Sequence, residues 1–76
     1  MDIKDIMEVV VEYRVRYHGT RLVEAREAAG LSQDDLADRL KVTQPYICKI
    51  ERPHLQCRHF TEDQYKTLKA IGFLGL

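Results

Sequence analysis

Two short segments with helical spacing of apolar residues lie only three residues apart in the middle of the chain. The first spans residues 33–40, the second spans residues 44–51, and residues 41–43 separate them. Helices joined by so short a turn must cross at a steep angle, and a small residue is needed where they touch. Ala37 stands at that position. The pattern therefore predicts a crossed pair of helices that leaves the outer face of the second one free.

Capping residues mark the first two of four expected helices. Thr20 can cap a helix that ends at Gly30, a residue type favoured just beyond a helix C-terminus. Ser32 can cap the next helix, with Asp35 where a capping box normally has Glu or Gln. Both signals divide residues 20–40 into two helices.

The second half of the chain has similar signals. Thr43 is placed to cap a third helix, and Pro45 falls within its first turn, where proline is tolerated. Pro53 ends this helix, and residues 54–60 are expected to form a loop. Thr61 can cap a last helix, which would close the core.

Residues 5–17 admit two interpretations. Alternation of β-branched and aromatic residues with polar ones, as in Val11, Tyr13, Val15 and Tyr17, favours a β-strand. A helix is the alternative, because apolar residues of the same stretch also fit one helical face. No second strand is evident elsewhere, so a strand here is expected to pair with a second copy across a dimer axis.

Size and charge favour a binding module over an enzyme. The chain has 76 residues, which leaves little scaffold for an active-site cleft. Its formal net charge is zero, but the segment 39–58 holds most of the cations of its half of the chain, with Glu51 as the sole acid. We find no signal peptide and no membrane-spanning stretch, and we expect two reduced cysteines and a cytoplasmic location.

The free outer face of the predicted helix 44–51 has the dimensions that fit the major groove of DNA. Glutamine can pair bidentately with adenine, and lysine can donate to guanine, so Gln44 and Lys49 are candidates for base contacts. The whole predicted face consists of Gln44, Pro45, Tyr46, Cys48 and Lys49.

Residues 20–71 resemble the lambda-repressor-like (Cro-type, XRE) helix-turn-helix regulators. The resemblance rests on Gly-Leu-Ser-Gln at 30–33, Leu-Ala at 36–37, Val-Thr-Gln at 42–44 and Ile-x-x-Ile-Glu at 47–51. It implies a mainly α fold, a bundle of four helices in residues 20–76. Residues 1–19 would form an N-terminal extension, with a β-strand used in dimerisation. It also implies a sequence-specific DNA-binding transcriptional regulator that binds a palindromic operator as a homodimer, without a cofactor.

The resemblance also assigns roles to single residues. Gln33 would bind a phosphate and brace the recognition helix, and Arg26 and Glu51 would form a structural ion pair. Base edges would be contacted by Gln44, Pro45 and Lys49. The sugar-phosphate backbone would be contacted by Thr43 and Tyr46, and the predicted DNA-binding set is completed by Cys48 and Arg52.

Two departures from the family pattern concern the exit of the recognition helix and the dimer surface. The usual Glu-Arg-Gly ending is Glu51-Arg52-Pro53 here, so the chain must leave the helix differently. The family's frequent fifth helix has no counterpart, and the N-terminal strand is expected to replace its dimer surface. An antitoxin or a restriction-system controller, with a protein partner as well as DNA, is the alternative function.

Four potential metal ligands cluster near the predicted loop. Cys48, His54, Cys57 and His59 form a C-x5-H-x2-C-x-H pattern. This spacing matches no familiar zinc finger, because the first cysteine lies on a helix and the other three crowd one loop. We therefore expect no metal site, and no catalytic residues.

Overall fold

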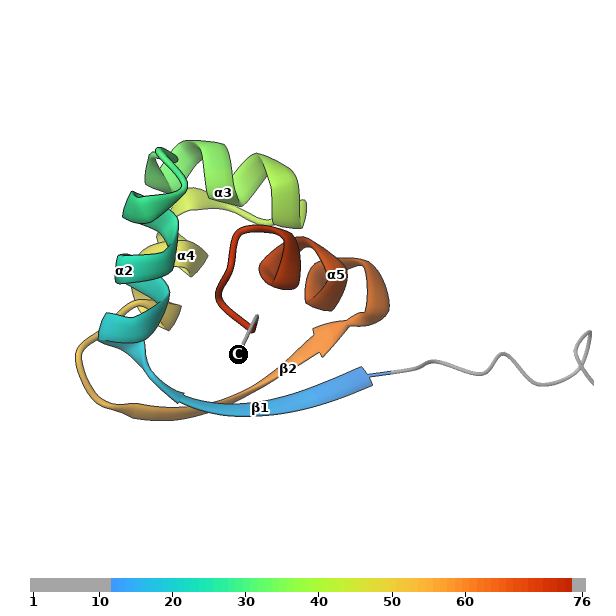
Figure 1. Cartoon of the computed structure of the whole chain (residues 1–76). Coiled ribbons are helices and arrows are strands. Elements are labelled where there is room, and N and C mark those ends of the chain that lie inside the picture. The colour runs from blue at the N-terminus through green and yellow to red at the C-terminus, as the bar shows by residue number, and fades with distance from the viewer. Residues whose placement is uncertain (1–11, 75–76) are drawn as a thin grey trace, which may run out of the picture.

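The computed structural model describes residues 12–74, in which two strands and four helices follow one another (Figure 1). Their bounds are β1 (Glu12–His18), α2 (Gly19–Ala28), α3 (Gln33–Leu40), α4 (Gln44–Ile50), β2 (Leu55–Thr61) and α5 (Glu62–Ala70). The fold is mainly α, a helix-turn-helix bundle with an N-terminal strand, as predicted. The strand prediction is confirmed from residue 12 onward, whereas residues 5–11 lie outside the described residues.

β1 and β2 form an antiparallel two-stranded sheet, with Glu12 opposite Thr61 and His18 opposite Leu55. The prediction of a loop at residues 54–60 is therefore wrong, and so is the expectation that the chain lacks a second strand. β1 finds a strand partner inside its own chain. Dimerisation is not required to pair this strand, and its role in a dimer stays a prediction.

All four helices lie on one side of the sheet (Figure 1). The sheet face toward them carries Tyr17, Gln56 and Phe60, which are buried. The opposite face is exposed and includes Arg14 and Arg16. The sheet thus contributes one wall of the core and leaves a polar outer surface.

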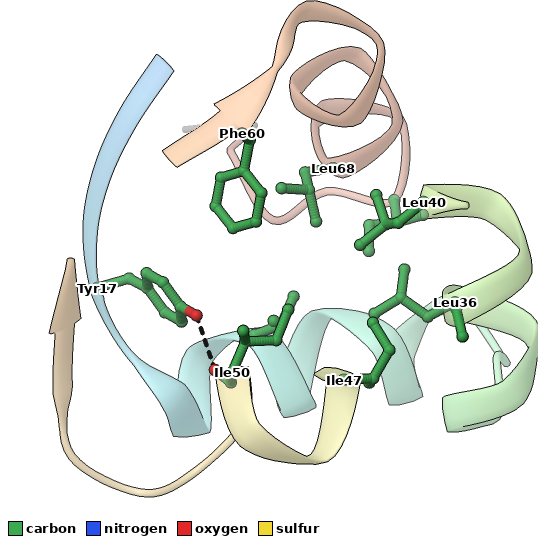
Figure 2. Packing of buried hydrophobic residues seen from close by; sticks show 10 residues of the cluster. Tyr17, Leu36, Leu40, Ile47, Ile50, Phe60 and Leu68 are labelled. Carbon is green, nitrogen blue, oxygen red and sulfur yellow. Dashed lines mark hydrogen bonds between the residues drawn. The ribbon is translucent and has the colours of Figure 1, made fainter. Parts of the chain in front are cut away.

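The core lies between the helices and the inner face of the sheet (Figure 2). Ala37 is 4% exposed, as expected for the small residue between α3 and α4. Val42 is half-buried and packs against this core. No helix within residues 12–74 has the length and apolarity needed to cross a membrane. The buried apolar residues are Tyr17, Leu22, Leu36, Ala37, Leu40, Ile47, Ile50, Phe60, Leu68 and Ile71.

Two of the predicted helix caps are present as complete capping boxes. The Ser32 hydroxyl accepts from the backbone N–H of Asp35, and the Asp35 carboxylate accepts from that of Ser32, both at 3.0 Å. These bonds lower the pKa of Asp35. Thr61 and Gln64 form the same box at the start of α5. Gly30 follows α2 with a φ of +73°, the conformation that glycine adopts at low cost.

α2 begins earlier than predicted. His18, not Thr20, is its N-cap, and the His18 ring accepts from the backbone N–H of Thr20 at 3.3 Å. Gly19 is therefore the first helical residue and is buried against the chain that leaves α4: its N–H donates to the carbonyl of His54 at 3.1 Å. The start of α2 and the end of α4 are in direct backbone contact.

Candidate nucleic-acid interface

α4 turns a polar face outward, away from its two buried isoleucines, Ile47 and Ile50. Tyr46 is half-buried beside this face, and Thr43 precedes it as an N-cap whose side chain makes no capping hydrogen bond. The helix ends at Ile50, one residue before the predicted end. Its exposed residues are Gln44, Pro45, Cys48 and Lys49, all members of the predicted DNA-binding set.

A chain of side-chain hydrogen bonds joins the first residue of α4 to α3 and α2. Gln44 Nε2 donates to Gln33 Oε1 at 2.7 Å, and Gln33 Nε2 donates to Glu51 Oε1 at 2.9 Å. Arg26 Nε donates to Glu51 Oε2 at 2.6 Å. The structure thus brings together Arg26 with Glu51, the pair that the resemblance implied, and also Gln33 with Gln44, a pair that was not predicted. We call these four residues the interhelical hydrogen-bond chain.

The inner end of this chain is a buried ion pair. Glu51 is 6% exposed, and Arg26 contacts both of its carboxylate oxygens. Arg26 also donates to the carbonyl of Leu31 at 2.9 Å, in the turn between α2 and α3. Because a buried carboxylate is stable only when it is paired and hydrogen-bonded, this anchor fixes α2, α3 and the end of α4 relative to one another.

The outer end of the chain holds the Gln44 amide in place. One Nε2 hydrogen is donated to Gln33, so the second hydrogen and the Oε1 lone pairs remain for a partner outside the protein. A bidentate contact to adenine needs one amide donor and one amide acceptor. The arrangement therefore presents a pre-oriented group of the kind that reads a base edge.

The C-terminal end of α4 is held by two residues that face each other across the sheet, Tyr17 and Gln56. The Tyr17 hydroxyl donates to the carbonyl of Ile50 at 2.7 Å, as Figure 2 shows. Gln56 Nε2 lies 3.0 Å from the same oxygen and 3.2 Å from the carbonyl of Arg52. The Gln56 amide is oriented by Arg58, whose Nε donates to its Oε1 at 2.8 Å. These contacts satisfy carbonyls that the helix leaves without intrahelical donors.

The Tyr17 contact makes stability depend on pH at the alkaline end. Burial raises the pKa of Tyr17 to about 12, because ionisation would place a charge in the core and remove the donor to Ile50. The stabilisation is therefore complete below pH ~10, the pKa of an unfolded tyrosine, and is lost as the pH rises toward the folded value.

We expect Tyr17→Phe to lower the free energy of unfolding by about 1 kcal/mol at pH 8, since Gln56 still satisfies the Ile50 carbonyl. The deficit relative to the parent protein should shrink between pH 10 and pH 12. Urea unfolding of both proteins at a series of pH values measures it. A deficit that stays constant up to pH 12 would contradict the role assigned to the hydroxyl.

The charges around α4 are unevenly distributed. α4 itself contains no acidic residue, and Lys49 and the following Arg52 are exposed. The first turn of α3 instead carries Asp34 and Asp35 directly after Gln33. Their negative charges stabilise α3, because they lie at the positive end of its dipole. Exposed cations therefore lie on the α4 side of the interface, and acidic side chains lie at the start of α3.

Residues 22–52 match the sequence profile of a family described as helix-turn-helix. This span holds α3, the turn and α4, together with both ends of the buried ion pair. Residues 22–52 form a helix-turn-helix, and the match supports the resemblance to lambda-repressor-like, XRE-type regulators. In a DNA-binding helix-turn-helix the second helix is the recognition helix, and α4 holds that position here. No curated protein and no solved structure matches the chain significantly.

The four sequence candidates for metal ligands do not converge. Cys48 lies on α4, His54 in the turn after it, and Cys57 and His59 on the outer face of β2. Within residues 12–74 no group of three or more His, Cys, Asp or Glu side chains is placed to hold a metal ion. Cys57 Sγ instead accepts from Arg14 Nε at 3.0 Å, which raises the pKa of Arg14.

Tyr17 and Gln56, which hold the end of α4 from behind, were not predicted to contact it. Tyr17 was assigned to a strand without a partner in the chain, and Gln56 to a loop. The available signal was Pro53 in place of the usual glycine, which shows that the helix exit differs. In the structure β2 follows that exit and returns along β1.

Proposed function

We propose that this protein is a transcriptional regulator that binds a specific palindromic operator as a homodimer, with α4 in the major groove. Gln44, Pro45 and Lys49 contact base edges, and Cys48 lies against the groove. Gln33, Thr43, Tyr46 and Arg52 contact the sugar-phosphate backbone. The protein acts in the cytoplasm by binding alone, without a cofactor or a catalytic step.

The observation that carries this proposal is the fixed Gln44 amide on an exposed, acid-free helix face. Gln44 stands at the first position of α4, and recognition helices of this class contact bases with their N-terminal residues. Its free donor and acceptor match adenine, and the Lys49 ammonium matches the acceptors of guanine. Pro45 limits the motion of the first turn, in which Gln44 lies.

Regulation would follow from occlusion of a promoter. Two recognition helices about 34 Å apart enter successive major grooves on one side of a two-fold symmetric operator. Because the chain has a net charge of zero, non-specific attraction to DNA is weak, and base contacts contribute much of the selectivity.

Gln44→Ala is expected to lower the preference for a specific duplex about tenfold or more, because each good bidentate base contact contributes about 1–3 kcal/mol of discrimination. The measurement is a fluorescence-anisotropy titration of the DNA upstream of the protein's own gene against a scrambled duplex, at two salt concentrations. Binding of the parent protein should weaken steeply with salt.

Lys66→Ala is the matched control, since Lys66 is an exposed cation on α5 that pairs with Glu62 at 3.5 Å. It should leave both affinity and selectivity unchanged. If the parent protein does not distinguish the two duplexes, the proposal is wrong. A co-purification experiment for a protein partner, such as a toxin, would then be the next step.

A further inference from the structure

Positive charge is concentrated in the sheet, α4 and the turn between them. These elements, residues 12–18 and 44–61, hold five lysine and arginine residues and two acids. Of the two acids, Glu51 is buried in its ion pair with Arg26, so Glu12 is the exposed one. The rest of residues 12–74 holds six lysine and arginine residues and seven acids. A chain of zero net charge therefore still presents a positive surface.

The outer face of the sheet extends this positive surface beyond α4. Arg14 lies opposite His59, Arg16 lies opposite Cys57, and all four residues are exposed. Arg14 Nε donates to Cys57 Sγ at 3.0 Å. This bond uses Nε alone, and Nη1 and Nη2 carry the donors that suit a phosphate. Glu12 lies at the end of β1 that is distant from α2, and its carboxylate is 3.6 Å from the His59 ring. The face therefore suits a partner with phosphate groups.

A hollow of about 400 Å³ lies at the end of the sheet where β2 begins. It is lined by Arg16, Leu55, Gln56 and Cys57. Leu55 is 80% exposed, and within residues 12–74 it is the one large hydrophobic residue that is exposed. An apolar side chain next to an arginine suits a sugar-phosphate backbone, because the sugar carbons can pack on the leucine while the phosphate contacts the guanidinium. This pairing explains a leucine that the core does not use.

This end of the sheet adjoins the C-terminal end of α4. Tyr17 follows Arg16 in β1, and its hydroxyl donates to the carbonyl of Ile50 at 2.7 Å (Figure 2). Gln56 follows Leu55 in β2, and its amide nitrogen lies 3.0 Å from the same oxygen. The inward neighbours of the hollow thus hold the end of the helix. The positive outer face of the sheet is therefore continuous with the surface that carries α4.

We propose that the outer face of the sheet binds the sugar-phosphate backbone of DNA next to the groove that α4 occupies, with Arg14 and Arg16 on phosphates and Leu55 against a sugar. This inference rests on the proposed function, because it takes α4 to lie in the major groove. Arg52, exposed in the turn between α4 and β2, links the two surfaces.

The sheet and the helix have different roles in this arrangement. Contacts to phosphate and sugar carry no sequence information, but they set the register and orientation of a protein on the duplex. The sheet therefore adds affinity for any duplex and fixes the angle at which α4 enters the groove. Because Tyr17 joins β1 to the last residue of α4, an orientation set at the sheet is passed directly to the helix.

Arg14→Gln/Arg16→Gln is expected to lower the affinity about tenfold for the upstream duplex and for the scrambled duplex alike. The slope of log affinity against log salt should become shallower by about 1.8, since each phosphate contact contributes about 0.9. The ratio of the two affinities should stay within about twofold of the parent value, because phosphate contacts do not read sequence. Fluorescence anisotropy over a series of salt concentrations measures all three quantities on the intact chain.

Lys66→Gln/Lys69→Gln is the matched control, since it removes the same charge from exposed positions on α5, across the core from α4 (Figure 2). Its affinity should stay within about threefold of the parent value and its salt slope should be unchanged. All four substituted residues are exposed, so both double variants should keep Tm within about 4 °C of the parent protein. Thermal unfolding checks that both proteins are folded.

Leu55→Ser tests the hollow without changing any charge. It should lower the affinity for both duplexes about threefold and leave the salt slope at the parent value, because it removes an apolar contact alone. An affinity equal to that of the parent protein would overturn the inference. So would a double arginine variant that binds like the α5 control, a result that would leave the face to another partner, such as an acidic protein.

Failure here is distinguishable from failure of the proposed function. A parent protein that prefers the upstream duplex, with a double arginine variant that binds like the α5 control, contradicts only the contact at the sheet. A parent protein that binds both duplexes equally, and a double arginine variant that binds both more weakly with a shallower salt slope, support the sheet contact and contradict sequence reading by α4.

Discussion

Gly19→Ala is expected to lower the free energy of unfolding by about 3 kcal/mol or more, because the new methyl group would collide with backbone. A Cβ atom at Gly19 would lie 1.8 Å from the carbonyl oxygen of Arg52 and 2.7 Å from the carbonyl carbon of Glu51. Neither atom belongs to a flexible side chain. Relief therefore requires the start of α2 and the exit of α4 to move apart.

That movement would affect more than one contact. The N–H of Gly19 donates to the carbonyl of His54, and Tyr17, two residues earlier, donates to the last residue of α4. Separation of the two segments weakens both bonds together. The loss should therefore appear as lower cooperativity as well as lower stability, with the end of α4 opening first.

Thermal unfolding followed by circular dichroism measures the effect, and the expected decrease in Tm is more than about 10 °C for a domain of this size. Thr20→Ala is the matched control, since Thr20 is exposed and contributes only its backbone N–H to the cap of α2. It should change the free energy of unfolding by less than about 0.5 kcal/mol. A Gly19→Ala protein as stable as the control would show that the α2–α4 contact is loose.

The helices were predictable because their signals are local. Ser32 with Asp35 and Thr61 with Gln64 are capping boxes written within four residues of sequence, and the structure contains both. The crossing of α3 and α4 follows from the length of the turn and the small size of Ala37. Such features depend on neighbours in sequence, so they can be recognised without knowing the rest of the fold.

β2 could not be predicted in the same way, because its residues are suited to contacts with segments that are distant in sequence. Its inward residues are Gln56, Arg58 and Phe60, so two of three positions on the core side are polar. A strand is normally recognised by apolar residues at those positions. Gln56 is buried because it supplies donors to the end of α4, and Arg58 orients it. Only the folded arrangement reveals that requirement.

The candidate interface was foreseen in its residues more than in its connections. The positions on α4 follow from helical spacing, and the pairing of Arg26 with Glu51 follows from the resemblance to known regulators. The support from Tyr17 and Gln56 involves two strands, one of which was not expected. A sequence thus identifies the candidate surface, whereas the contacts that fix its orientation come from the complete fold.

Arg26→Met is expected to destabilise the protein by about 3 kcal/mol, because it leaves the Glu51 carboxylate buried without its cation. Gln33 would remain as a single neutral donor, which does not offset the loss of a charge. Replacing both partners, as in Arg26→Met/Glu51→Leu, removes the buried charge altogether. The double variant should therefore recover most of the lost stability, and urea unfolding compares the three proteins.

The same double variant separates stability from DNA recognition. Without the Glu51 carboxylate, Gln33 Nε2 loses its acceptor, so the Gln33 amide is free to rotate and no longer fixes Gln44. We expect the double variant to be well folded yet to lose about 1 kcal/mol of preference between specific and scrambled duplex, in the direction of Gln44→Ala. Full retention of selectivity would mean that Gln44 is positioned without the interhelical hydrogen-bond chain. A double variant as unstable as Arg26→Met would contradict this account. It would show that the fold needs the ion pair itself, and not only the absence of an unpaired buried carboxylate.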